Sequence, residues 1–153
     1  MGVDLEIAGR TVAIETLLLD FTGTLSKDGR ILPGVAARLK TISKRLKIVI
    51  LTADTFGTAK KALSDLPVEV NLIATGIDKA RFIRRAGPGS VMAVGNGRND
   101  VSMVSLAALG IAVVGPEGAA GELVRSADIV VREINDALDL LLHPQRLKAT
   151  LRD

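Results

Sequence analysis

A chain of 153 residues is about one domain long and can bury a hydrophobic core without disulfides or a structural metal. It contains no Cys, which excludes thiolate chemistry, and its net charge of +3 is only mildly basic. Hydrophobic residues make up 48% of the chain but aromatic residues only 2%, so the core must be aliphatic, and base stacking on nucleic acid is disfavoured. No apolar stretch approaches the length of a membrane span and no signal-peptide pattern opens the chain, so we expect a cytoplasmic protein.

Apolar strands alternate with amphipathic helices along the chain. A hairpin is expected first, with one arm at 3–8 and the other at 11–19, followed by a turn-rich stretch and a helix that starts near Pro33. The remaining expected elements are a strand at 47–51, a helix at 57–66, a strand at 68–74, a helix at 78–86, a strand at 91–94, a helix from 99 or 100 to 108, a strand at 110–114, a helix at 118–126, a strand at 129–131, a helix at 134–142 and a short basic helix or frayed end at 144–153.

This alternation predicts an α/β fold, with a mainly parallel sheet flanked by helices. No linker, low-complexity segment or repeat divides the chain, so residues 1–153 are expected to form a single domain.

Polar residues follow three of the predicted strands, where ligands bind in an open parallel sheet. Asp20 to Thr24 follow the first buried strand, Thr52 follows the second, and the loop 95–100 follows the strand at 91–94, while Lys79 begins the helix before it. A carboxylate can attack phosphorus and form an acyl phosphate, given a hard cation such as Mg²⁺ and donors for the phosphoryl oxygens. The sequence therefore indicates phosphoryl transfer, with Gly23 allowing the backbone to approach the phosphate closely.

Four motifs, in order, resemble those of the haloacid dehalogenase superfamily. Asp20-Phe21-Thr22-Gly23-Thr24-Leu25 is similar to the first motif, Thr52 to the second, Lys79 to the third, and Gly95-Asn96-Gly97-Arg98-Asn99-Asp100 to the fourth. The resemblance implies a Rossmann-like fold in which Asp20 is phosphorylated while Thr52 and Lys79 hold the phosphoryl group. It implies Mg²⁺ ligation by Asp20, the Thr22 carbonyl, and Asn96 or Asp100. The expected substrate-binding residues are Gly23, Thr24, Ala53, Arg98 and Asn99.

Two positions depart from the pattern of the superfamily's phosphatases. Thr22 stands where those enzymes have a second Asp that acts as general acid and base, and in this respect the motif is similar to that of P-type ATPases. Asn96 stands where a metal-binding Asp is usual, so a cation should bind more weakly. The combination resembles the soluble, P-type-ATPase-like branch of the superfamily.

Neither gap between the motifs is long enough for a cap domain. The stretch 25–47 holds only a turn and one helix, and 55–78 only a helix and a strand. We therefore expect an open site, unless another subunit covers it, with 26–32 as a flap.

Several of these residues also have ordinary structural interpretations. Arg98 reaches either the phosphate or solvent, Asp100 could cap the following helix, and Lys79 could be a solvated lysine at a helix start. Asp54 is expected to cap its helix and His143 to end one. The glycine-rich stretch 115–121 is expected to be a turn and helix start and not a dinucleotide loop.

The leading hypothesis is a Mg²⁺-dependent phosphohydrolase that works through phospho-Asp20. Without a carboxylate at position 22, hydrolysis should be slow and should favour good leaving groups, as in acyl phosphates or nucleoside triphosphates. The expected substrate is a phosphorylated small molecule or nucleotide; a phosphoprotein and a homo-oligomer are left open. The alternative is a regulatory module that binds a phosphorylated ligand with little turnover, and nucleic-acid binding has only the basic charge in its favour.

Overall fold

The computed structural model describes residues 1–54, 57–73 and 75–153. Its centre is a six-stranded sheet in the order β10-β9-β8-β3-β6-β7, with every neighbouring pair parallel. This confirms the expected Rossmann-like α/β fold. The strands are β3 (Thr16–Asp20), β6 (Lys47–Thr52), β7 (Glu69–Leu72), β8 (Val91–Gly95), β9 (Leu109–Val113) and β10 (Ile129–Val131).

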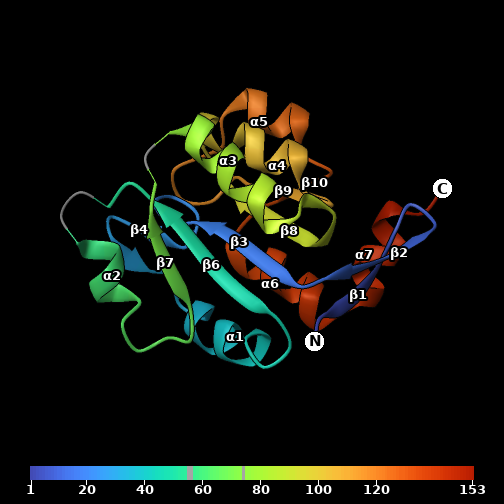
Figure 1. The fold of residues 1–153 in the computed structure, drawn as a ribbon, viewed down its shortest axis with the longest axis horizontal. Coiled ribbons are helices and arrows are strands. Elements are labelled where there is room, and N and C mark those ends of the chain that lie inside the picture. Colours follow the sequence, from blue (N-terminus) through green and yellow to red (C-terminus); the bar gives the residue numbers. More distant parts are fainter. Residues whose placement is uncertain (55–56, 74) are drawn as a thin grey trace.

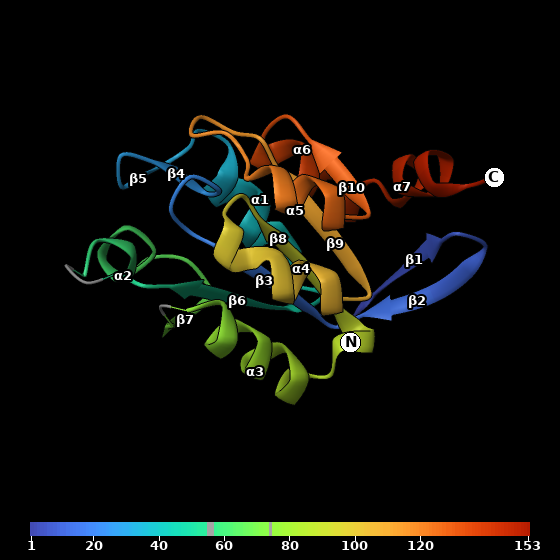
Figure 2. The same cartoon turned by 90° about the horizontal axis from the view of Figure 1, so that it is seen from above.

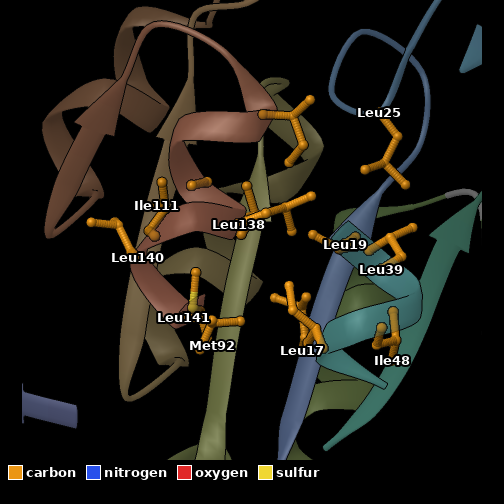
Figure 3. Packing of buried hydrophobic residues seen from close by; sticks show 14 of the residues in the cluster. Leu17, Leu19, Leu25, Leu39, Ile48, Met92, Ile111, Leu138, Leu140 and Leu141 are labelled. Atoms are coloured by element: carbon orange, nitrogen blue, oxygen red, sulfur yellow. The ribbon is translucent and has the colours of Figure 1, made fainter. Parts of the chain in front are cut away.

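Helices cover both faces of this sheet (Figure 1). On one face lie α1 (Val35–Ile42) and α6 (Ile134–Leu142), and on the other α3 (Gly76–Ala86), α4 (Val101–Leu106) and α5 (Gly121–Ser126). Successive side chains of a strand point to opposite faces, so Leu17 and Leu19 of β3 join one core cluster and Leu18 the other. Figure 3 shows the first cluster, where Leu17 and Leu19 lie near Leu39 of α1. All three strand residues are fully buried, because β3 lies in the middle of the sheet.

The expected N-terminal hairpin is present, but as a separate two-stranded sheet. It pairs β1 (Val3–Ile7) with β2 (Arg10–Ile14), and α7 (Pro144–Leu151) packs on it through the buried Leu147 (Figures 1 and 2). The second arm does not run on to residue 19 as expected. At Glu15 the chain passes into the main sheet, where the Glu15 N–H donates to the Ser90 carbonyl and the Glu15 carbonyl accepts from the Lys47 N–H. Of the two expectations for the segment 144–153, a helix or a frayed end, the structure shows a helix over most of the segment, packed on the hairpin.

Some predicted boundaries shift by a few residues, for local reasons. α3 begins at Gly76, two residues early, because the Thr75 hydroxyl accepts a hydrogen bond of 3.1 Å from the Asp78 N–H. The helix α2 (Thr58–Ala62) is shorter than the expected 57–66, and α5 begins at Gly121, not at residue 118. The predicted strand at 68–74 reaches Ala74, which lies outside the described residues. Two 3₁₀ turns, η1 (Pro88–Ser90) and η2 (Arg98–Asp100), precede β8 and α4.

A small hairpin stands beyond the carboxyl end of β3. Its strands, β4 (Ser26–Lys27) and β5 (Arg30–Ile31), are joined by a tight turn whose residues Asp28 and Gly29 both have positive φ, 51° and 79°. Together with α1 it fills the interval from β3 to β6, and the described part of the interval from β6 to α3 holds only α2 and β7. The described residues therefore contain no cap domain. Across the same residues, no helix combines the length and apolar character needed to span a bilayer.

Gly110 of β9 provides a sharp test of this packing. A Cβ at Gly110 would lie 2.1 Å from the Val104 carbonyl oxygen, so Gly110→Ala should lower the free energy of unfolding by at least about 2 kcal/mol. Gly89→Ala is the matched control, because a Cβ there meets nothing within 4 Å, and its effect should stay within about 0.5 kcal/mol. Urea denaturation followed by circular dichroism measures both. Equal stability of the two variants would contradict this arrangement of α4 and β9.

Candidate active site

Asp20 and Asp100 share the ammonium group of Lys79. Asp20 is the last residue of β3, and Lys79 lies in α3. The Lys79 Nζ is 3.2 Å from Asp20 Oδ1 and 2.6 Å from Asp100 Oδ1. The Lys79 side chain is only 1% exposed and that of Asp100 is fully buried. The alternative of a solvated lysine at a helix start is therefore wrong. Three segments far apart in the sequence thus meet at the carboxyl edge of the sheet, where ligands bind in this class of fold.

Backbone amides hold Asp100 from the other side. Its Oδ2 accepts from the N–H groups of Asn96 and Gly97, at 3.2 and 3.0 Å. A Cβ at Gly95 would lie 2.5 Å from Asp100 Cγ, so the glycine makes room for the carboxylate. Asp100 makes no side-chain cap bond to α4, but its bond from the Gly97 N–H closes a capping box at η2 (Arg98–Asp100), the turn that leads into α4, so the capping role coexists with the bond to Lys79. The side chain thus joins the fourth-motif loop to Lys79.

Thr24 bridges Asp20 and Asn96. Its hydroxyl oxygen lies 3.2 Å from Asp20 Oδ2 and 3.2 Å from Asn96 Oδ1. A hydroxyl carries only one proton, so it cannot donate to both oxygens at once. The amide nitrogen of Asn96 donates to the Gly118 carbonyl at 3.2 Å, which turns its oxygen toward Thr24. The side-chain oxygens of Asp20, Thr24 and Asn96 therefore cannot all receive a hydrogen bond from one another, and a bound cation would stabilise them.

At Gly23 the first-motif loop packs closely against Asn96. Its φ is 75°, and a Cβ there would lie 2.5 Å from Asn96 Nδ2. The loop is held by Ser26, whose buried hydroxyl donates to the Phe21 carbonyl at 3.1 Å and whose carbonyl accepts from the Gly23 N–H. This role of Ser26 was not predicted from the sequence, since a serine among turn residues carries no distinctive signal.

Thr52 lies one strand away from Asp20. The register pairs Asp20 with Leu51, so Thr52 follows at the carboxyl end of β6, where it is 3% exposed and its hydroxyl accepts from the Asp54 N–H at 3.3 Å. Asp54 Oδ2 accepts from the Lys60 N–H at 3.3 Å, consistent with the expected capping role. Ala53, between them, is exposed.

The structure does not bring every expected residue into this cluster. The Arg98 side chain is 86% exposed and its Nε lies 3.2 Å from Glu122 Oε2, so of its two alternatives the structure favours solvent. Asn99 and Thr22 are exposed, the latter forming a backbone bridge to Ser26. His143 follows the last residue of α6 and is exposed, as a helix-end residue is expected to be.

The loop after β9 packs against the site, which no pattern in the sequence indicated. Besides the bond from Asn96 to the Gly118 carbonyl, the Ala120 N–H donates to the Asn96 carbonyl at 2.8 Å. A Cβ at Gly115 would lie 2.9 Å from the Gly23 carbonyl oxygen. The stretch 115–121 is a turn and helix start, as predicted, and its glycines also allow close contact with the first- and fourth-motif loops.

No family model matches the chain. Uncharacterized protein MJ0073 of Methanocaldococcus jannaschii is 57% identical over 63 residues, covering 41% of this chain and 68% of that protein. The phospholipid-transporting ATPase neo1 of Schizosaccharomyces pombe is 38% identical over 88 residues, which are 56% of this chain but only 8% of that ATPase. A HAD family hydrolase structure from Streptomyces avermitilis superposes with a TM-score of 0.71 at 22% identity, covering 86% of this chain and 87% of that one. The chain therefore has the fold of haloacid dehalogenase superfamily hydrolases.

A second structure from this superfamily has the same fold and contains bound ligands. The 3-deoxy-D-manno-octulosonate 8-phosphate phosphatase of Moraxella catarrhalis, in complex with magnesium, phosphate and KDO, has a TM-score of 0.71 and 15% identity, covering 90% of each chain. At this identity the likeness shows the shared fold. In this haloacid dehalogenase fold, the four motif positions lie at the carboxyl edge of the sheet, around β3, β6 and β8.

Burial and charge strongly affect the two titrating groups beside Asp100. Burial, and then repulsion from Asp100, raise the pKa of Asp20 from 3.8 to about 7, although Lys79 opposes this change. Burial alone would lower the pKa of Lys79, but attraction to Asp20 and Asp100 more than offsets it, and the pKa is raised. Lys79 therefore stays charged, while Asp20 in the metal-free protein titrates near neutral pH.

The raised pKa of Asp20 predicts how the stability of the metal-free protein changes with pH. The folded state holds the Asp20 proton more tightly than the unfolded chain, so the free energy of unfolding should fall as pH rises from 3.8 to about 7. Asp20→Asn removes this titration, so its stability relative to the parent should rise across that window. Urea denaturation in EDTA at several pH values measures the difference. A difference that stays constant with pH would contradict the prediction.

Proposed function

We propose that the protein is a Mg²⁺-dependent phosphohydrolase that works through a phospho-Asp20 intermediate. The observation that carries this proposal is the buried ion cluster in which Lys79 holds Asp20 and Asp100 at the carboxyl edge of the sheet. A buried charge cluster is costly to maintain for stability alone. Its position beside two polar loops favours a role in catalysis.

The residues present fit a hard cation. Asp20, the Thr22 carbonyl, and Asn96 or Asp100 would hold it, and the three oxygens around Thr24 share too few protons to satisfy one another. Within the described residues, no group of three or more His, Cys, Asp or Glu side chains could hold a metal, so ligation would depend partly on Asn96 and backbone oxygens. When bound, Mg²⁺ would offset the repulsion between a carboxylate and an incoming phosphate. The superfamily phosphatase from Moraxella catarrhalis was solved with this ion.

The chain's own residues account for both halves of the reaction. A carboxylate oxygen of Asp20 bonds to phosphorus while the bond from phosphorus to the leaving oxygen breaks, and the leaving oxygen takes a proton from solvent or keeps its charge. Lys79 orients Asp20 and, together with Thr52 and the first-motif loop amides, holds the phosphoryl oxygens. Water then attacks phosphorus, which releases inorganic phosphate and restores the Asp20 carboxylate.

Thr22 determines which leaving groups are expected. A threonine hydroxyl cannot act as an acid or base near neutral pH, so leaving groups that need no proton should react fastest. Acyl phosphates and nucleoside triphosphates meet this condition better than alkyl phosphates. In the same proposal residues 1–153 act as one cytoplasmic domain of the P-type-ATPase-like branch, and its substrate is a phosphorylated small molecule or nucleotide.

Thr22→Asp should raise the turnover of alkyl phosphates, because it restores a carboxyl group where leaving oxygens can be protonated. General acid and base catalysis typically raises a reaction rate by about 100- to 10,000-fold, and even an increase of about tenfold would be measurable. The measurement compares glycerol phosphate with acetyl phosphate, and only the alkyl ester should gain. An unchanged or slower rate with the alkyl ester would contradict the role given to position 22.

The proposal is tested by trapping the intermediate. Protein incubated with Mg²⁺ and ³²P-labelled acetyl phosphate or ATP, then quenched in acid, should carry label that hydroxylamine removes and that maps to the peptide containing Asp20. Release of inorganic phosphate should follow and should require Mg²⁺. Phosphate binding without label or release would instead favour the regulatory module, which the neutral Asn96 and Thr22 also allow.

A further inference from the structure

A groove runs along the edge of the sheet, between β7 and α3. It has a volume of about 810 Å³ and is lined by Leu72, Ile73, Asp78, Arg81, Arg84 and Arg85, which we call the β7–α3 groove. A second hollow of about 420 Å³ continues it and shares Ile73 and Arg85. Figure 2 shows α3 running beside β6 and β7 at one edge of the molecule. Neither hollow includes a residue of the Asp20 cluster, so the groove is not needed for phosphoryl transfer.

The floor of the groove is an edge strand. The Ile73 N–H donates to the Thr52 carbonyl at 2.8 Å, so this residue's backbone faces β6. Backbone groups alternate along a strand, so the N–H and C=O groups of Val70 and Leu72 face outward. No strand in the described part of the chain pairs with that edge. Leu72 is 55% exposed, which leaves an apolar side chain beside these backbone groups.

The wall of the groove is basic. Arg81 forms an exposed ion pair of 3.4 Å with Asp78, but Arg84 and Arg85 have no ion-pair partner among the described residues. Three guanidinium groups against one carboxylate leave the wall with a net positive charge. A negatively charged occupant complements this wall.

We propose that the β7–α3 groove binds an extended acidic segment of a partner protein, which adds to β7 as a further strand. Side chains on one face of such a segment point toward α3, so Glu or Asp at alternate positions would meet the arginines. Apolar residues in the segment would cover Leu72, and its backbone would pair with Val70 and Leu72. A second copy of this chain is disfavoured, because pairing two β7 edges would bring two arginine walls together. Nucleic acid is disfavoured, because the floor offers outward carbonyls and an apolar side chain to its phosphates.

The test uses a labelled eight-residue peptide of alternating Val and Glu, capped at both ends, with binding to the full chain followed by fluorescence anisotropy. The peptide should bind at low salt, and Arg84→Glu/Arg85→Glu should weaken binding by about tenfold or more. Lys40→Glu/Lys44→Glu makes the same charge change on the α1 side of the molecule and should leave the affinity within about twofold. The same peptide with N-methylated valines keeps its charge but lacks strand hydrogen bonds, and it should bind poorly.

Four outcomes would overturn the proposal. They are equal losses in both double variants, equal binding of the N-methylated peptide, no binding of the Val-Glu peptide at all, and tighter groove-dependent binding of a single-stranded oligonucleotide. Circular dichroism of both double variants establishes that each is folded. None of these measurements depends on phosphatase activity, so the groove and the proposed reaction succeed or fail separately.

Discussion

Replacing Asp20 with Asn is expected to lower Mg²⁺-dependent phosphate release by at least about 10,000-fold, as loss of a covalent nucleophile does in other enzymes. An amide oxygen is a poor nucleophile, so the variant side chain could not form the acyl phosphate. The shape of the side chain is kept, so Lys79 and Thr24 retain a neighbour of the same size. Colorimetric phosphate release from acetyl phosphate, ATP and p-nitrophenyl phosphate measures the loss.

Asp54→Asn is the matched control for this variant. Asp54 lies two residues beyond Thr52, and its role is to accept the Lys60 N–H, which an Asn side chain can also do. Asp54→Asn should retain most of the activity. In the ³²P-trapping experiment, no label should map to the peptide that contains residue 54. Equal activity of Asp20→Asn and the parent protein would remove Asp20 from the reaction and contradict the phospho-Asp20 intermediate.

Replacing Lys79 with Met is expected to be the most destabilising of the single changes considered, by about 3–5 kcal/mol, because it leaves two buried carboxylates without their cation. Methionine nearly matches the length of the lysine stem, so the loss is mainly electrostatic. Urea denaturation at neutral pH measures it. Activity should vanish as well, since Asp20 would lose the group that orients it.

Two further variants separate this effect from simple misfolding. Lys47→Met removes an exposed ion pair with Glu69, whose side chains are 59% and 47% exposed, and should cost no more than about 1 kcal/mol. The double variant Asp20→Asn/Lys79→Met leaves one buried carboxylate fewer, so it should recover part of the stability lost in Lys79→Met. If Lys79→Met and Lys47→Met were equally stable, the buried cluster of Lys79, Asp20 and Asp100 would not contribute significantly to the free energy of unfolding.

The periodicity of the chain determined the order and type of nearly every element. Buried strands such as β3 and β8 are short aliphatic runs, and α1 and α6 place apolar residues at helical spacing, so local pattern and tertiary burial agree. Element ends were less certain, because they depend on single interactions such as the Thr75 cap of α3. The path at Glu15 also depended on partners distant in the sequence, Lys47 and Ser90, which no local pattern reveals.

The motif residues and their order were also visible in the sequence, since Asp20, Thr52, Lys79 and the loop 95–100 each follow or flank a predicted strand. Their contacts were decided only by the tertiary structure. Parallel strands bring together groups separated by 59 and 21 residues, so that one buried ammonium binds both Asp20 and Asp100. Arg98, two residues before Asp100, turns instead to solvent and Glu122. The sequence could supply the chemistry of each side chain, but burial, charge pairing and pKa arise from neighbours that only the folded chain brings into contact.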